Sequence, residues 1–416
     1  MSQRWNLQPA VRWIHGAAPL LTLTWLILGF LVCFAAAAFA ASSDETRLLA
    51  YDYRMAGDQT HTRIIIHFDR EPEIGWFLLR APHRLVLDLP ESEFSFEEEA
   101  IAPRGLVARV RYGRMSPGHS RMIFTVSGPF TVDDLNVLKN ENAPGYRIII
   151  DIAAASQEAF EAAMRKRIPA LPEDAGVAKA PTKKGSKDGR FTVVIDPGHG
   201  GIDGGARGVS GIEEKMITLA FALELRKKLE AMGKYNVALT RETDVFLRLD
   251  ERVRIARENE ADLFISLHAD SIRLPNFRGA TVYTLSERAS DAEAAATAAR
   301  ENLSDEIAGF VAAESDDEVT DILIDLIRRE THAFSIRFAR TLLGELSGSV
   351  ELVGNPLRSA GFIVLRAPDV PSVLLELGYL SNAEDEKLMR DAAWRSEAVD
   401  RIIEAINIFA EAGARG

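Results

Sequence analysis

Three residues of this 416-residue chain are placed where catalytic residues often occur: His199, His268 and Glu376. Each stands at the end of a short apolar run, which is typical of a buried strand. The carboxyl ends of parallel strands meet at one edge of a sheet, where α/β folds place their chemistry. Imidazoles and carboxylates are zinc ligands and acid–base catalysts. The sequence therefore predicts one active edge that gathers these three side chains.

A fourth candidate comes from Glu213 or Glu214, in the turn before a predicted helix. Two imidazoles and one carboxylate form a zinc site with an open position for water, and a further carboxylate can then act as the base. The residue pattern alone leaves the choice between the two glutamates open.

The first histidine lies in the glycine-dense stretch 191–205, FTVVIDPGHGGIDGG. Glycines let a backbone bend sharply and let a bulky group approach it. Arg207, beside this loop, is a candidate for gripping an anionic part of a substrate. Polar residues near the strand ends are expected to orient loops or ligands rather than to bind metal; they are Asp196, Asp270 and Asn382.

The elements that carry these residues indicate an α/β domain over residues 190–416. Apolar runs predict strands at 191–197, 236–240, 261–267, 278–285, 361–366 and 371–376, and amphipathic patterns predict helices at 214–232, 247–259 and 392–410. Strands that alternate with helices indicate a mostly parallel sheet flanked by helices. A long helical section, about 287–346, interrupts the alternation.

Residues 44–155 have a different pattern, typical of an all-β sandwich. Short strands are predicted at 62–68, 76–79, 84–89, 108–112, 121–126 and 146–152. The histidines here are scattered, so a binding module is expected rather than a metal site. Residues 156–189, which begin with a possible short helix and continue with Pro, Ala, Lys and Gly, are expected to be a linker.

The first 41 residues are typical of a signal peptide: two arginines, an uncharged apolar run and an Ala-Phe-Ala site that favours cleavage after Ala40. A periplasmic protein is therefore expected. The run is also long enough for an uncleaved membrane anchor. The single cysteine, Cys33, lies inside this segment. The formal net charge of −12 argues against nucleic acid as a partner, and a monomer is expected.

Four ordered motifs of the second domain resemble the Amidase_3 family of zinc-dependent N-acetylmuramoyl-L-alanine amidases: IDPGHGG, GIEEK, SLHAD and LLELGYLSN. The resemblance implies that Zn2+ is bound by His199, Glu214 and His268, and that Glu376 is the catalytic base. Glu214 is chosen because the family's glutamate directly precedes a lysine, as Glu214 precedes Lys215. The implied reaction hydrolyses the amide bond between N-acetylmuramic acid and L-alanine of peptidoglycan.

The first domain resembles the AMIN domain, a peptidoglycan-binding and septum-targeting module found ahead of such amidases. The resemblance rests on TRIIIHFDREPEIGWFLLRAPHRLVLDLP and the closing GYRIIIDI. Together the two resemblances imply cell-wall remodelling and daughter-cell separation.

The helical section of about 287–346 resembles a regulatory insertion of septal amidases, in which a helix plugs the zinc cleft. Here AATAARENLSDEIAGF is the expected plug, with Glu301 as the carboxylate that reaches the metal. A LytM-type activator would withdraw it. An apolar stripe is expected to pack in the core or, as the alternative, to be that activator's landing site; it consists of Ile322, Leu323, Leu326 and Ile327. The alternative is an ordinary solvated helix, because runs of charge usually face water.

Two other functions stay open at this point. One is a non-catalytic peptidoglycan-binding scaffold, and the other is a zinc peptidase of the cell wall. The intact set of two histidines and two glutamates argues against the scaffold.

Overall fold

The computed structural model describes residues 47–80, 82–116, 118–166, 189–274, 276–310 and 322–413. The expected signal peptide with Cys33, most of the expected linker, and residues 311–321 of the insertion lie outside the described residues, as do the side chains of the apolar stripe at 322–327. Among the described residues, none of the helices has the length and apolar character needed to cross a bilayer.

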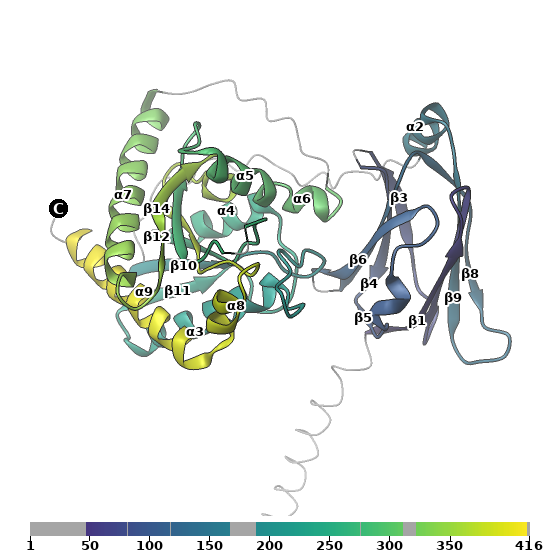
Figure 1. The fold of residues 1–416 in the computed structure, drawn as a ribbon, viewed down its shortest axis with the longest axis horizontal. Coiled ribbons are helices and arrows are strands. Elements are labelled where there is room, and N and C mark those ends of the chain that lie inside the picture. Colours follow the sequence, from purple (N-terminus) through teal and green to yellow (C-terminus); the bar gives the residue numbers. More distant parts are fainter. Residues whose placement is uncertain are drawn as a thin grey trace, which may run out of the picture. The chain divides into compact units, whose positions relative to one another are not determined.

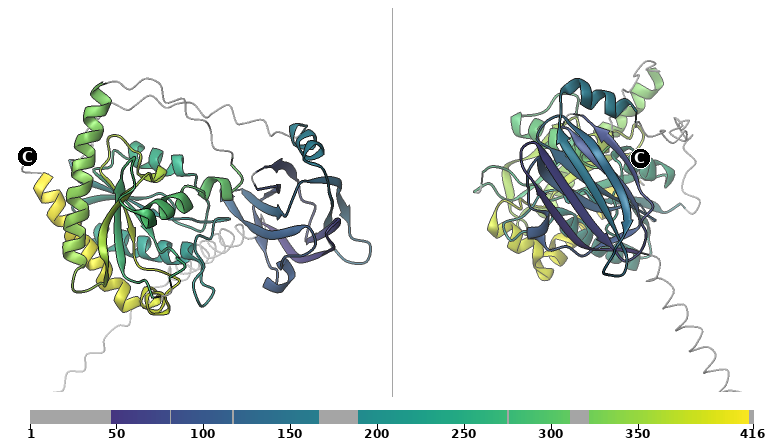
Figure 2. Two further views of the ribbon diagram at one scale, coloured as in Figure 1. Left: turned by 45° about the horizontal axis from the view of Figure 1, so that its top comes forward. Right: turned by 90° about the vertical axis from the view of Figure 1, so that its right-hand side faces the viewer.

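The N-terminal domain is a β sandwich (Figure 1). One sheet has the strand order β5-β1-β2-β9-β8 and the other the order β3-β4-β7-β6. Figure 2 (right) shows strands of this domain lying side by side. The elements are β1 (Leu48–Gly57), β2 (His61–Phe68), β3 (Gly75–Leu79), β4 (Arg84–Pro90), β5 (Ser92–Phe94), η1 (Glu98–Ile101), β6 (Val107–Ser116), β7 (His119–Val126), β8 (Phe130–Lys139) and β9 (Tyr146–Ala154).

Alternation between buried and exposed residues explains why these segments form half-buried strands. In β2 the buried side chains of Ile64, Ile66 and Phe68 alternate with partly or fully exposed ones. The inward residues of both sheets share one apolar core. Helix α2 (Gln157–Arg165) follows β9, and its Phe160 is buried in the same core. The start of the segment expected as a linker therefore packs against this domain.

The C-terminal domain is built on a mixed sheet of six strands, in the order β11-β10-β12-β15-β13-β14. The pairs among β11, β10, β12 and β15 are parallel, and β13 runs antiparallel to β15. The strands are β10 (Phe191–Pro197), β11 (Tyr235–Leu239), β12 (Leu263–His268), β13 (Ala280–Leu285), β14 (Leu352–Ala360) and β15 (Ser372–Glu376). The mostly parallel sheet that the sequence predicts is confirmed.

Helices cover both faces of this sheet (Figures 1 and 2). On one face α3, α7 and α9 share an apolar cluster with the strands, and on the other face α4, α5 and the short helix η2 do so. The helices are α3 (Glu214–Ala231), α4 (Leu249–Glu258), α5 (Ala292–Glu301), α6 (Ser304–Ile307), α7 (Ile322–Leu346), η2 (Ile363–Leu365), α8 (Ala383–Arg390) and α9 (Ala392–Gly413).

One predicted strand is wrong. Residues 361–366 contain the 3-10 helix η2, and the strand β14 precedes them. Val364 and Leu365 are buried under α4 and α5, so the apolar run marks a buried irregular segment. β14 lies at the edge of the sheet and contains Gly, Asn, Pro and Arg, which hide it from an apolar pattern.

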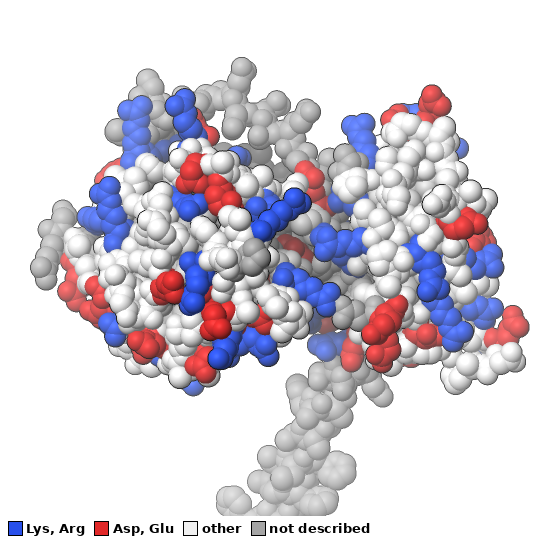
Figure 3. All heavy atoms as spheres, viewed as in Figure 1, with Lys and Arg blue, Asp and Glu red and all other residues white. Residues whose placement is uncertain are grey.

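Acidic and basic side chains are interspersed on the face shown in Figure 3. Such mixing of both signs is typical of a solvated protein surface.

Candidate metal centre and active site

The edge formed by the ends of β10, β12 and β15 gathers the predicted residues. His268 and Glu376 are register partners at the ends of β12 and β15. Pro197 pairs with Leu267, so the loop after β10 brings His199 to the same edge. Glu214 comes from the first position of α3, and Glu301 from the last position of α5. All five side chains are buried.

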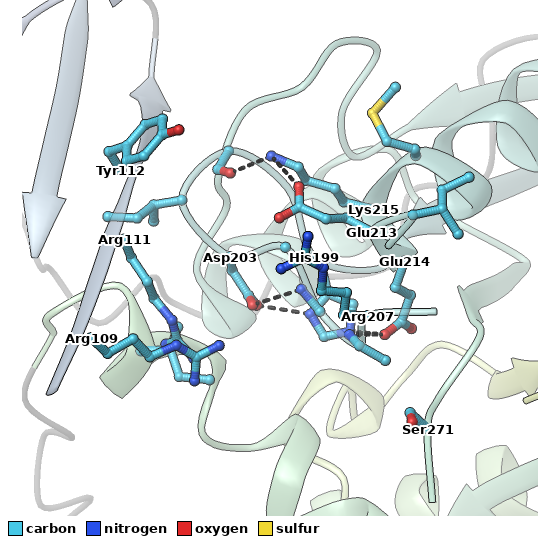
Figure 4. A pocket seen from close by; sticks show the side chains of 18 of the residues that line it. Arg109, Arg111, Tyr112, His199, Asp203, Arg207, Glu213, Glu214, Lys215 and Ser271 are labelled. Carbon is cyan, nitrogen blue, oxygen red and sulfur yellow. Dashed lines mark hydrogen bonds and ion pairs between the residues drawn. The ribbon is translucent and has the colours of Figure 1, made fainter. Parts of the chain in front are cut away.

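The two histidines lie beside the same two carboxylates. Figure 4 labels His199 and Glu214. Glu214 lies 3.1 Å from Nε2 of His199 through Oε2, and 3.2 Å from Nδ1 of His268 through Oε1. Oε2 of Glu301 lies 3.3 Å and 3.1 Å from the same two nitrogens. Ligand atoms of His199, His268 and Glu301 lie within 4.8 Å of one another. Both carboxylates therefore converge on both imidazoles.

These nitrogens lack ordinary hydrogen bonds, although they are buried. Nε2 of His199 and Nδ1 of His268 have no hydrogen-bond partner among the described residues. Buried polar atoms without partners are rare and call for an explanation, such as a bound ion. Imidazole nitrogens and carboxylate oxygens are zinc's usual ligands outside cysteine sites. The donor set fits a divalent metal ion such as zinc.

The electrostatics of the cluster agree with a site for positive charge. Burial lowers the pKa of His268, but Glu301 and Glu214 outweigh burial and raise that pKa to about 10. The pKa of His199 is likewise raised well above its usual value by Glu214, Asp203 and Glu301, against the effect of burial. The histidines in turn lower the pKa of Glu214 well below its usual range. The buried carboxylates therefore stabilise positive charge beside them.

Glu376 has a different environment. Its Oε2 accepts a hydrogen bond from the backbone N–H of Asp270 at 2.9 Å, and its Oε1 has no partner among the described residues. Burial, together with the charge of Asp270, raises the pKa of Glu376 well above its usual value. A buried carboxyl with a raised pKa and a free oxygen is suited to taking up and returning a proton.

The loop that carries His199 is close-packed against the other candidate ligands. His199 has a φ of 59°, in the left-handed region that residues with a Cβ seldom adopt. A Cβ at Gly198 would lie 2.5 Å from His268, and one at Gly205 would lie 2.6 Å from both Glu214 and His199. At these two positions the absent side chain makes room for the protein's own ligands, whereas the sequence suggested room for a substrate.

The backbone of this loop accepts hydrogen bonds from a buried arginine. Arg252 donates to Oδ1 of Asp196 at 2.8 Å and to the backbone oxygens of Pro197 and His199, each at 2.9 Å. Asp196 also accepts hydrogen bonds from Thr240 and Ser266. Asp196 therefore helps to fix the backbone that presents His199.

The other polar residues near the strand ends have separate contacts. Asn382 accepts from the N–H groups of Glu384 and Asp385, which caps α8. Asp270 accepts a hydrogen bond from Arg300 on α5. Arg207 lines the cavity beside His199 (Figure 4), as Lys215 also does.

Sequence reasoning missed several residues at this site: Asp203, Arg241, Arg252, Arg300 and Ser304. Asp203 accepts a hydrogen bond from Nδ1 of His199 at 2.8 Å (Figure 4). Its place in the glycine loop, four residues after His199, was the available signal. For Arg241 and Arg252 the sequence offered no such signal, because each donates to backbone oxygens of distant segments.

Known protein families match both domains of the chain. A family model described as N-acetylmuramoyl-L-alanine amidase matches residues 193–408, and a model of the AMIN domain matches residues 51–144. The chain is 28% identical over 372 residues to N-acetylmuramoyl-L-alanine amidase AmiC of Escherichia coli O6:H1, which covers 85% of this chain and 88% of that protein. It is 40% identical over 232 residues to AmiA of Escherichia coli K12, which covers 56% and 79%.

Solved structures are also similar to part of the chain. The catalytic domain of CwlV, an N-acetylmuramoyl-L-alanine amidase from Bacillus (Paenibacillus) polymyxa var. colistinus, is 28% identical, covers 53% of this chain and 98% of its own, and has a TM-score of 0.40. The amidase model spans more than half of the chain's length. The chain therefore belongs to the Amidase_3 family of N-acetylmuramoyl-L-alanine amidases, with an AMIN domain ahead of its catalytic domain.

Proposed function

We propose that this protein is a zinc-dependent, periplasmic peptidoglycan amidase, in which His199, Glu214 and His268 bind the metal and Glu376 is the general base. The observation that carries the proposal is the convergence of two buried imidazole nitrogens, neither with a hydrogen-bond partner, on Glu214. When bound, zinc supplies Lewis-acid polarisation of the amide carbonyl and acidifies the attacking water.

The residues around the reacting amide then have distinct tasks. Oε1 of Glu376, the oxygen without a partner, takes a proton from the attacking water. The hydrogen bond from the N–H of Asp270 holds the other oxygen in place during this step. The protonated carboxyl passes its proton to the departing amino group of L-alanine, which leaves as a neutral amine. No serine or cysteine nucleophile is needed.

The test is a digest of purified peptidoglycan sacculi, with mass spectrometry of the products and metal analysis of the protein. Free stem peptides that begin with L-alanine are expected. Glu376→Gln should keep zinc at the wild-type level and lower the rate by roughly 10²–10⁴-fold, since it removes only the proton transfer. Cuts within the peptide would instead indicate a peptidase, and no release, even after removal of the insertion, would indicate a wall-binding scaffold.

We also propose that the insertion, residues 287–346, inhibits the enzyme at rest. The end of α5 supports this, because Oε2 of Glu301 lies within 3.3 Å of both candidate histidine ligands. The neighbouring Arg300 donates to Asp270, whose backbone N–H holds Glu376. Buried Ala294, Thr297 and Ala298 seat the same helix against the domain. Glu301 would thus compete with a substrate for the position beside the two histidines.

Glu301→Ala tests this inhibition. It should raise the basal rate of sacculus digestion several-fold, because the carboxylate that competes for the metal is gone. Glu397→Ala, which removes an exposed glutamate from α9, is the control and should leave the rate near that of the wild type. Removal of residues 291–329 should give a gain at least as large, and the absence of any gain in both variants would sink the idea.

The physiological part of the proposal is daughter-cell separation. The AMIN domain would hold the enzyme on peptidoglycan, and a LytM-type activator would withdraw α5 from the site. Addition of a purified activator domain to the wild type should then raise its rate to that of Glu301→Ala, and it should add little to that variant. Equal stimulation of both would contradict this mode of activation.

A further inference from the structure

The two nitrogens of His199 face different groups. Nε2 faces the candidate metal position, and Nδ1 lies 2.8 Å from Oδ2 of Asp203. The Asp203 side chain is almost fully buried, with 4% of its surface exposed. The contact between this carboxylate and the imidazole is therefore screened from water.

Asp203 is held in place by its own loop. The backbone N–H of Gly200 donates to the oxygen of Asp203 at 2.8 Å, and the N–H of Asp203 donates to the oxygen of Gly200 at 3.0 Å. The N–H of Gly205 donates to Oδ1 at 3.1 Å. These bonds close a tight turn directly after His199, so the carboxylate is fixed before any ligand arrives.

A fixed carboxylate on Nδ1 determines how the imidazole can bind a metal. It accepts the Nδ1–H, which leaves the lone pair of Nε2 directed at the metal position and fixes the plane of the ring. It also makes Nε2 a stronger donor.

The same carboxylate oxygen has a second donor, from the insertion. Oγ of Ser304, at the start of α6, lies 2.6 Å from Oδ2 of Asp203. Ser304 is buried and lies three residues after Glu301. On the metal-facing side of His199 the insertion contacts the imidazole directly through Glu301. On the opposite side Ser304 contacts Asp203, which in turn contacts Nδ1 of His199.

We propose that Asp203 is the positioning residue that prepares His199 for the metal, and that its bond from Ser304 latches the insertion over the site. This inference rests on the proposed zinc site. Asp203, which is not itself an expected metal ligand, thus has two roles: it strengthens metal binding and it retains the inhibitory segment.

Zinc affinity tests the positioning role, measured on the full-length protein by competition with a fluorescent chelator. Asp203→Asn keeps the shape of the side chain and removes its charge, and it should weaken zinc binding by roughly 10–100-fold. Asp244→Asn is the matched control. Asp244 accepts from the N–H of Gly201 in the same loop at 2.7 Å and pairs with Lys215, and no hydrogen bond or ion pair joins it to a histidine within the described part of the chain. It should change the affinity by less than about threefold.

Repeating both measurements in a Glu301→Ala background removes the insertion's own carboxylate from the comparison. Circular dichroism of the metal-free proteins checks that each variant folds. Equal zinc affinities for the Asn variants at 203 and 244 would overturn the positioning role. If the wild type itself bound no zinc, the proposed function would fail first and this inference with it.

The basal rate of sacculus digestion tests the latch. Ser304→Ala should raise the rate about three- to tenfold, because it removes one charge-assisted hydrogen bond that holds the insertion. It should leave zinc affinity within about threefold of the wild type. Ser304→Thr, which keeps the hydroxyl, should stay near the wild-type rate. A rate for Ser304→Ala equal to that of Ser304→Thr would overturn the latch and leave the positioning result standing.

Discussion

At the scale of single residues, the site depends on positions where no side chain fits. Gly205 has a φ of 68°, and a Cβ there would lie 2.6 Å from both Glu214 and His199. The glycine is thus required both by its backbone conformation and by the two side chains beside it. Gly348 has a similar backbone, with a φ of 97°, but open space around the missing Cβ.

This contrast gives a prediction. Gly205→Ala should lower zinc affinity by at least tenfold, because Glu214 or His199 has to move away from the new methyl group. Gly348→Ala is the control for backbone strain alone and should lower thermal stability slightly while leaving zinc affinity unchanged. Equal zinc affinities for the two variants would show that the crowding at Gly205 is relieved without moving the ligands.

The buried ion pair of Asp196 and Arg252 should make the stability of the protein depend on pH. Burial raises the pKa of Asp196, but Arg252, Thr240 and Ser266 outweigh it and hold the pKa below its usual value. A carboxyl whose pKa is lowered by folding adds stability above its unfolded pKa, about 3.9, and loses that stability as the pH falls through the folded value. Asp196→Asn should therefore cost roughly 3 kcal/mol at pH 7, with a smaller difference from the wild type below about pH 4.

Urea unfolding from pH 7 to pH 3 measures this difference. A stability loss of the same size at every pH would show that the charge of Asp196 contributes little and that its hydrogen bonds carry the effect.

At the scale of elements, α5 determines whether Glu301 reaches the histidines. Its N-cap is Asp291, whose Oδ1 accepts from the N–H of Ala294 at 2.9 Å and from Arg358 at 3.2 Å. Removal of an N-cap costs about 1 kcal/mol of helix stability. Because Glu301 lies at the far end of this helix, that cost bears on the proposed inhibition.

Asp291→Ala should accordingly raise the basal rate of sacculus digestion up to about fivefold, the equivalent of about 1 kcal/mol. Ser156→Ala is a matched control, because Ser156 caps α2 in the β domain through the N–H of Ala159. It should leave the rate unchanged. A similar gain in both variants would assign the effect to general destabilisation.

At the scale of the whole molecule, the two domains have separate main cores. One apolar cluster fills the β sandwich, and two others lie on either face of the six-stranded sheet. The candidate zinc ligands all belong to the second domain. Metal binding should therefore be coupled most strongly to the stability of that domain.

Calorimetry with and without zinc tests this coupling. Zinc at 1,000 times its dissociation constant should stabilise the catalytic domain by about 4 kcal/mol, a shift in its midpoint of roughly 10 °C. Removal of the metal by a chelator should reverse the shift, and His268→Ala should abolish it. Glu376→Gln should keep it, because Glu376 is not an expected ligand. A larger shift in the β domain's transition than in that of the catalytic domain would contradict this coupling.

Much of the fold was predictable from segments whose own apolar pattern determines their structure. Buried parallel strands are apolar throughout, so β10, β12 and β15 are visible in the sequence, and so are the residues at their ends: His199, His268 and Glu376. The strands that the sequence did not reveal are β1, β5, β8 and β14. β5, β8 and β14 lie at sheet edges, where fewer side chains are buried and the apolar pattern weakens.

The sequence by itself thus predicted the two fold types, an active edge and the candidate residues His199, His268 and Glu376, and the family resemblance added Glu214 and Glu301. The tertiary structure placed the expected Glu301 against both histidines, and it alone showed that Asp203 lies against Nδ1 of His199 and that Ser304 reaches that carboxylate. The physical reason is range. Strand and helix patterns arise from neighbours a few residues apart, whereas the contact between Ser304 and Asp203 joins residues 101 positions apart, which only the packing of α6 against the glycine loop brings together.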